Sequence, residues 1–133
     1  MNIQPPKANI LYEDEEVMIV LDIDPISQGH ALILPKIVYK DLDDLPEALM
    51  HKIMKLARIY VSILKETFSP MGYSIMQNGG AFNELDQFHL HVFPRFQKEE
   101  FSWTYAEDVP KEAKDFSHLQ SILAKEIYSS LKN

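Results

Sequence analysis

The stretch QFHLHVFP at residues 87–94 constrains the fold of this chain more than any other. Every second residue from Phe88 to Val92 is apolar, which is the period of a half-buried β-strand. Gln87, His89 and His91 then share the opposite face, each about 6.5–7 Å from the next. Because histidine changes charge near neutral pH, we interpret this polar stripe as a candidate functional site.

Length and composition indicate one ordinary globular domain. The chain has 133 residues, of which 46% are hydrophobic and 25% charged. A net charge of −7 argues against partners that need a basic surface, namely nucleic acid and anionic membranes, but not against a small phosphate ligand. The absence of cysteine excludes disulfides and thiolate metal sites. With no signal peptide and no long apolar run, we expect a cytoplasmic protein.

The first half of the chain predicts three strands. Apolar runs at 10–12 and 17–21 flank four acidic residues, which we interpret as a solvated hairpin turn after a loose arm at 1–7. Pro25 and the turn that follows it separate the second run from a third strand at 30–35. His30 opens that third strand directly after a glycine.

The second half predicts a helix, two strands and a final helix. Apolar residues at helical spacing predict a helix over 45–68, with Asp43 or Asp44 as its N-cap. Strands at 73–77 and 87–94 follow, and residues 101–105 alternate as in an edge strand or an extended lid. A C-terminal helix is expected within 108–131. This order predicts an α+β domain with a mainly antiparallel five-stranded sheet, helices on one face and the polar stripe on the open side.

Two imidazoles on one strand face allow two kinds of chemistry. They can chelate a metal, although zinc needs further ligands and Gln87 is a poor one. Alternatively, one imidazole can attack phosphorus while the other handles protons. The turn at Asn78-Gly79-Gly80 has backbone N–H groups that can bind a phosphate.

The chain resembles the histidine triad (HIT) superfamily of nucleotidyl hydrolases and transferases in two regions. The segments 77–80 and 88–95 are similar to the family's Asn-Gly turn and histidine signature. The segments 21–25, 29–30 and 32–36 are similar to its nucleoside-binding region. The resemblance covers about residues 10–96 and implies a single HIT-like domain over 1–133, with core 10–96 and a helical extension at 108–131.

The resemblance also implies roles for matching residues. His89 corresponds to the nucleophile that forms a nucleotidyl-histidine intermediate, and His91 and His30 to the histidines around the phosphate. For nucleotide binding, Asp22 corresponds to the ribose-binding carboxylate, Ile23 to the apolar wall against the base, and Asn78 to the turn residue beside the phosphate.

Two positions depart from the family pattern. Gln87 replaces the first histidine of the signature, and Val38 replaces a histidine often found after the third strand. Glutamine forms hydrogen bonds but does not titrate, so an acid–base role at residue 87 is lost. Some branches of the family carry a serine or threonine before the signature, and we do not assign that residue's role to Glu84.

The leading hypothesis is a hydrolase or nucleotidyl transferase, a phosphoramidase or dinucleoside polyphosphate hydrolase, that acts on the α-phosphate of a purine nucleotide through His89. A nucleotide-binding or sensing module with little turnover, and a histidine-based metal-binding protein, are the alternatives. The resemblance further implies a homodimer, no cofactor and no metal.

Overall fold

The computed structural model describes residues 3–97 and 101–132. The chain separates into two units, Met1–Phe101 and Ser102–Asn133. The first unit holds one long helix and five strands: β1 (Ile10–Glu13), β2 (Val17–Leu21), β3 (Ala31–Pro35), α1 (Glu47–Phe68), β4 (Gly72–Met76) and β5 (Leu90–Arg95). The described residues of the second unit, 102–132, hold one α-helix, α2 (Phe116–Leu131). The expectation of a single domain over 1–133 stays a prediction.

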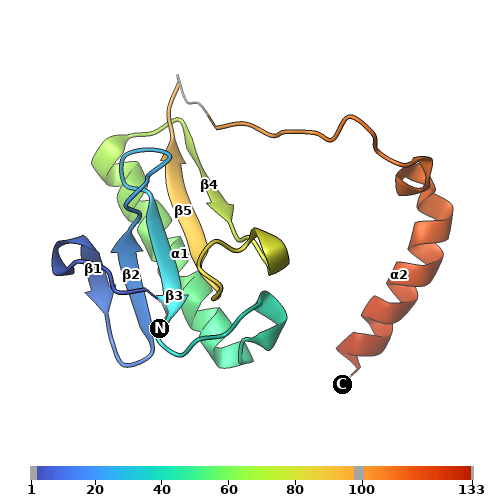
Figure 1. Ribbon diagram of the computed structural model, residues 1–133, viewed down its shortest axis with the longest axis horizontal. Coiled ribbons are helices and arrows are strands. Elements are labelled where there is room, and N and C mark those ends of the chain that lie inside the picture. The colour runs from blue at the N-terminus through green and yellow to red at the C-terminus, as the bar shows by residue number, and fades with distance from the viewer. Residues whose placement is uncertain (1–2, 98–100, 133) are drawn as a thin grey trace. The chain divides into compact units, whose positions relative to one another are not determined.

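The five strands form one antiparallel sheet in the order β1-β2-β3-β5-β4 (Figure 1). The β1–β2 hairpin turns at the predicted acidic run, where the Asp14 carboxylate accepts hydrogen bonds from the backbone N–H groups of Glu16 and Val17. The pairing of β3 with β5 brings Leu32 opposite His91, although these residues are 59 positions apart in the chain. The predicted α+β class and five-stranded antiparallel sheet are confirmed.

Helix α1 covers one face of the sheet and forms the main core with it (Figure 1). Its buried stripe packs against alternate residues of the three central strands, as the helical and period-2 patterns predict. The core comprises Val17, Ile19, Ala31, Ile33, Ile53, Ala57, Tyr60, Val61, Leu64, Phe88, Leu90 and Val92. The apolar half of the histidine stretch therefore faces the helix.

The opposite face of the sheet carries a smaller apolar cluster of Met18, Val20, Leu32 and Leu34. His91 pairs with Leu32 and so lies on this second face. The polar stripe was expected on the open side of the sheet, and His91 does lie on the face away from α1. The face is nevertheless not open at this point, because His91 is buried.

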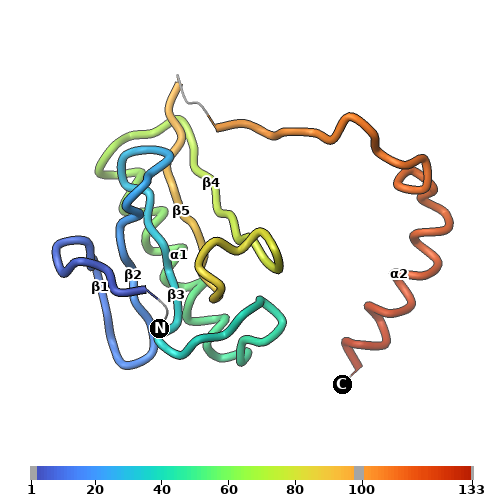
Figure 2. Tube along the Cα trace, viewed as in Figure 1, coloured from blue at the N-terminus to red at the C-terminus, as the bar shows by residue number. Residues whose placement is uncertain are grey.

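The histidine strand begins later than predicted, at Leu90 rather than at residue 87. Its first residues bond to loops instead of to a strand. The Phe88 N–H donates to the carbonyl of Tyr39 at 2.6 Å, and the carbonyl of Gln87 accepts from the Asn83 amide at 3.0 Å. Figure 2 shows the loop after β3 beside the connection from β4 to β5, which these bonds hold together.

The predicted N-cap of the long helix is wrong. Asp43 and Asp44 belong to a 3₁₀ turn, Leu42–Asp44, which Asp41 caps. The N-cap position of α1 is Pro46, which has no side-chain hydrogen bond. Its fixed φ suits the entry to a helix, and the missing N–H is not needed there.

The second unit consists of an irregular segment and an amphipathic helix. Residues 101–105 form no strand, so of the two expectations for this segment the edge strand is wrong and the extended lid stays a prediction. Helix α2 begins at Phe116, later than expected, because residues Lys111–Lys114 form a 3₁₀ turn and Asp115 caps the helix by accepting from the His118 N–H. No residue of α2 is buried. Neither α-helix in the described ranges has the length and apolarity that a membrane span requires.

Candidate active site

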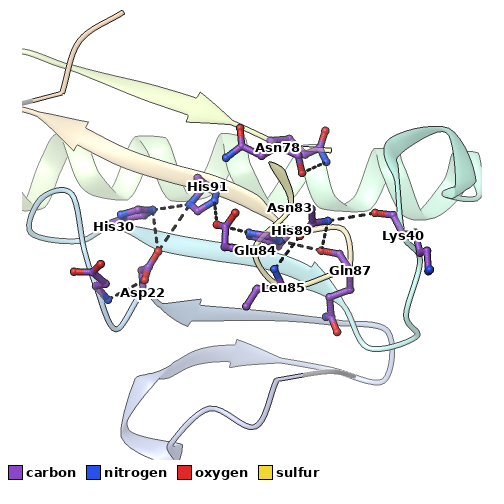
Figure 3. Close-up of polar contacts among 12 residues, drawn as sticks. Asp22, His30, Lys40, Asn78, Asn83, Glu84, Leu85, Gln87, His89 and His91 are labelled. Atoms are coloured by element: carbon purple, nitrogen blue, oxygen red, sulfur yellow. Dashed lines mark hydrogen bonds and ion pairs between the residues drawn. The ribbon is translucent and has the colours of Figure 1, made fainter. Parts of the chain in front are cut away.

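Four polar side chains from two distant parts of the first unit are buried together. His30, Gln87, His89 and His91 are each at most 5% exposed. Buried polar groups need hydrogen-bond partners, and those partners determine which nitrogen of each imidazole carries a proton. The protonation pattern of the site can therefore be worked out from the backbone outward (Figure 3).

His30 is oriented by the turn that precedes β3. The backbone N–H of Ile26 donates to its Nδ1 at 2.9 Å, so in the neutral ring the proton lies on Nε2. That Nε2 is 2.9 Å from Nδ1 of His91 and 3.4 Å from Oδ2 of Asp22. Burial lowers the pKa of His30 despite the nearby Asp22 carboxylate, so the neutral ring is favoured.

His91 continues the same chain of hydrogen bonds. Its Nδ1 accepts the proton offered by His30, which leaves its proton on Nε2. That Nε2–H points to Oε1 of Glu84 at 3.1 Å. Burial, reinforced by the neighbouring His89, lowers the pKa of His91. His91 is therefore a neutral donor directed to the place that Glu84 occupies.

His89 faces the same carboxylate from the other side. Its Nδ1 is 2.9 Å from the carbonyl oxygen of Gln87, and because a carbonyl only accepts, Nδ1 carries a proton. Its Nε2 is 3.1 Å from Oε1 of Glu84. Once Glu84 is displaced and the proton on Nε2 is removed, this nitrogen presents a lone pair to the site. That is the geometry that a histidine nucleophile requires.

Glu84 is the member of the cluster that the sequence did not reveal as functional. Burial raises the pKa of its carboxyl, but hydrogen bonds from its own backbone N–H and from His89 outweigh this, so the pKa lies below its usual value and the group is ionised. The only signal in the sequence was an acidic residue five positions before His89 in a turn-rich segment. Such residues are usually solvated, and Glu84 is indeed 52% exposed.

Three predicted site residues lie outside this hydrogen-bonded cluster. Among the described residues no hydrogen bond joins the Asn78 side chain to the histidines, and Figure 3 places it on the far side of them from Asp22. Ile23 is 83% exposed and, with Asp22, lines a cavity of about 240 Å³. Gln87 serves the cluster through its backbone carbonyl, and its side chain points away from His91 (Figure 3). The structure thus brings together His30, His89, His91 and Asp22.

The same atoms include two sets that could hold a metal ion. One set is Asp22, His30 and His91, and the other is Glu84, His89 and His91. Two imidazoles and one carboxylate are a common zinc-ligand set, and the Gln87 carbonyl would orient His89 as such ligands require. In both sets, however, the hydrogen bonds described above place a proton on a facing ring nitrogen, Nε2 of His30 in the first set and Nε2 of His91 in the second, which opposes metal binding.

Comparison with known proteins identifies the family. A family model described as HIT domain matches residues 5–98. The chain belongs to the HIT family. The Bacillus subtilis HIT relative named "Protein hit" is 33% identical, with 94% of this chain and 88% of the relative covered. The adenosine 5'-monophosphoramidase HNT1 of Candida albicans is 31% identical, with 86% of this chain and 78% of the relative covered.

Solved structures of HIT proteins have the same fold as this chain. A crystal structure of a HIT family protein from Bacillus anthracis matches with a TM-score of 0.78 and 27% identity, over 91% of this chain and 86% of the other. The HIT family includes hydrolases, and the buried imidazoles described above are chemically suited to nucleotidyl transfer.

Proposed function

We propose that this HIT protein is a nucleotide hydrolase or nucleotidyl transferase that acts on the α-phosphate of nucleoside phosphoramidates or dinucleoside polyphosphates. His89 attacks the phosphorus and forms a covalent nucleotidyl intermediate, which water then cleaves. One observation carries the proposal: the bond from His89 Nδ1 to the Gln87 carbonyl directs Nε2 toward the site. The same bond stabilises the positive charge that the ring acquires when Nε2 becomes bonded to phosphorus.

The neighbouring groups fit the remaining tasks of this chemistry. The Nε2–H of His91 can donate to a phosphoryl oxygen, and His30 keeps His91 in the tautomer that donates. Asp22 and Ile23 line the small cavity, and Asp22 also lies 3.4 Å from His30, so the two residues suit the ribose and the purine base. Asn78 would contact the phosphate or the leaving group from the turn after β4.

Gln87 would stand where the family signature has its first histidine. A side chain that does not titrate removes one acid–base group, while the backbone carbonyl of the same residue still orients His89. We therefore expect turnover to persist with an altered rate or leaving-group preference. The monophosphoramidase name of the Candida relative supports amines as leaving groups.

The test is release of AMP from an adenosine phosphoramidate by the native protein and by His89→Ala. A His51→Ala variant is the matched control, because His51 is exposed on α1, where its Nε2 lies 3.9 Å from Oε1 of Glu47. The proposal expects loss of AMP release in His89→Ala only. Equal rates for native protein and His89→Ala would refute the mechanism. Tight AMP binding without any adduct would instead favour the sensing module.

A metal-binding function is the second candidate, because Glu84, His89 and His91 converge on one point with an open side. A bound divalent ion would occupy the place where the phosphorus must enter, so the two functions exclude each other at this site. Metal analysis of the purified protein, and AMP release in the presence of a chelator, distinguish them. Activity that persists without metal supports nucleotidyl transfer.

We also propose that the chain forms a homodimer in the cytoplasm. Strand β4 lies at an edge of the sheet and exposes apolar side chains, among them Met71 beside it, Tyr73 and Ile75. An edge strand of this composition favours pairing with another chain. Light scattering after size-exclusion chromatography measures the mass directly, and Ile75→Lys is expected to shift it to that of the monomer. A monomeric native protein would contradict this.

A further inference from the structure

Glu84 occupies the point at which a substrate's phosphoryl group must lie. One oxygen of its carboxylate, Oε1, is 3.1 Å from Nε2 of both His89 and His91. Both nitrogens belong to buried rings, whereas Glu84 is 52% exposed on the connection that leads from β4 to β5. An entering nucleotide can therefore move the carboxylate aside, but it cannot move the imidazoles.

The hydrogen bonds around Glu84 require one proton more than the three imidazoles carry when each of them is neutral. The bond from the Ile26 N–H places the His30 proton on Nε2, and the bond from this Nε2–H to Nδ1 of His91 places the His91 proton on Nε2. His91 donates that Nε2–H to Glu84. His89 already carries a proton on Nδ1. A second hydrogen bond between His89 Nε2 and the same carboxylate needs an additional proton between them. The resting site thus stores a proton on the His89–Glu84 pair.

That proton has a use in the proposed reaction. Cleavage of a phosphorus–nitrogen bond expels an amine, which leaves poorly unless its nitrogen is protonated. Phosphate and sulfate leave as anions that need little or no protonation. Gln87, at the signature position, cannot supply a proton.

We propose that Glu84 is the general acid that protonates the departing amine, so that the site cleaves phosphorus–nitrogen bonds in preference to bonds with acidic leaving groups. This rests on the proposed nucleotidyl transfer through His89. As substrate moves the Glu84 carboxylate away from the two imidazoles, the carboxylate loses the hydrogen bond from His89 that lowers its pKa. The stored proton then passes to Glu84 and leaves a lone pair on His89 Nε2. That lone pair forms the new nitrogen–phosphorus bond while the bond from phosphorus to the amine breaks.

The electron pair of the broken bond goes to the amine nitrogen, which takes the proton from the Glu84 carboxyl. The amine departs neutral, Glu84 returns to the carboxylate, and the nucleotidyl-His89 ring keeps its Nδ1 proton on the Gln87 carbonyl. The oxygen of a water molecule then replaces His89 Nε2 on the phosphorus. One proton of the water returns through Glu84 to His89 Nε2, and the other leaves on the nucleoside monophosphate. Protons and charges balance without any further reactant.

The test uses Glu84→Gln and two adenylyl substrates in the full-length protein. The amide can accept from His91 Nε2–H and donate to His89 Nε2, so the cluster stays bonded but no longer stores an acidic proton. The first substrate is an adenosine phosphoramidate of an alkylamine, and the second is adenylyl sulfate, whose leaving group needs no proton. The ratio kcat/KM reports the steps up to departure of the leaving group. Glu47→Gln, which removes an equal charge from an exposed position on α1, is the control.

We expect Glu84→Gln to lower kcat/KM for the phosphoramidate about 10²- to 10⁴-fold and for adenylyl sulfate less than about 10-fold. Formate added to Glu84→Ala should restore part of the phosphoramidate activity. Equal losses on both substrates, or no loss on the phosphoramidate, would overturn the role of Glu84 while leaving His89 as nucleophile. If the native protein forms no His89 adduct with the phosphoramidate, the proposed function itself fails, and this inference fails with it.

Discussion

Gly29, the residue before His30, gives the sharpest test of how the fold positions the site. Its φ of +92° lies in a region that side chains rarely adopt. A Cβ at this position would also lie 2.9 Å from Cδ2 of Leu64 and 3.0 Å from Cε2 of Phe68, both on α1. Leu64 is buried in the core, so it cannot easily move away.

Gly29→Ala should therefore lower the free energy of unfolding for two separate reasons. The unfavourable φ costs about 1–2 kcal/mol. Inserting a methyl group into a packed core costs about 1–3 kcal/mol. The sum is about 2–5 kcal/mol, a substantial part of the roughly 5–15 kcal/mol by which a domain is stable.

Two other glycines separate these contributions. Gly80 has a φ of +60° but no atom within 4 Å of a built Cβ, so Gly80→Ala should lose only about 1–2 kcal/mol. Gly72 has neither constraint, and Gly72→Ala should change stability by about 0.5 kcal/mol or less. Urea unfolding followed by circular dichroism measures all three. A Gly29→Ala loss no larger than that of Gly80→Ala would refute the close packing of this turn against α1.

Three further predictions concern the same architecture. Burial lowers the pKa of His30 and His91, so near pH 6.5 these side chains bind protons in the unfolded chain but not in the folded one. The free energy of unfolding should therefore fall as the pH drops below about 6.5. Urea unfolding at several pH values measures this slope, which His30→Gln should flatten. Hydrogen bonds from the Lys52 side chain and from the backbone hold the pKa of Asp14 well below its usual range. The contribution of Asp14 to stability should therefore be present above about pH 4 and disappear as the pH falls further. Asp14→Asn should remove this dependence from the urea unfolding measured at several pH values. Tyr60→Phe removes the 2.7 Å hydrogen bond from the Tyr60 hydroxyl to the Gly29 carbonyl and should cost about 1 kcal/mol in urea unfolding, whereas an unchanged midpoint would mean that this bond contributes nothing.

The sheet and the long helix were predictable because their residues repeat at the periods of their elements. The alternation around Leu90 and Val92 gave the strand and the face that packs on α1, and the helical stripe gave α1 itself. The ends of elements were less predictable, because they depend on contacts with distant loops. Phe88 leaves the strand to bond with Tyr39, which no local pattern indicates.

The histidines of the site were predictable, but the residue between them was not. His89 and His91 stand two positions apart in a stretch that alternates as a strand does, and His30 follows a glycine turn, so the sequence and the family resemblance both draw attention to them. Glu84 lies in an irregular turn, and only the folded chain brings its carboxylate to both imidazoles. The orientation of each ring likewise depends on backbone groups, those of Ile26 and Gln87, whose role has no sequence signature.

The most direct test of the central claim is mass spectrometry of the protein quenched during turnover of an adenosine phosphoramidate. Nucleotidyl transfer through His89 predicts a mass increase of one adenylyl group, located on the peptide that contains His89 and absent in His89→Ala. Release of AMP with no adduct on that peptide, or an adduct on His91 instead, would contradict it.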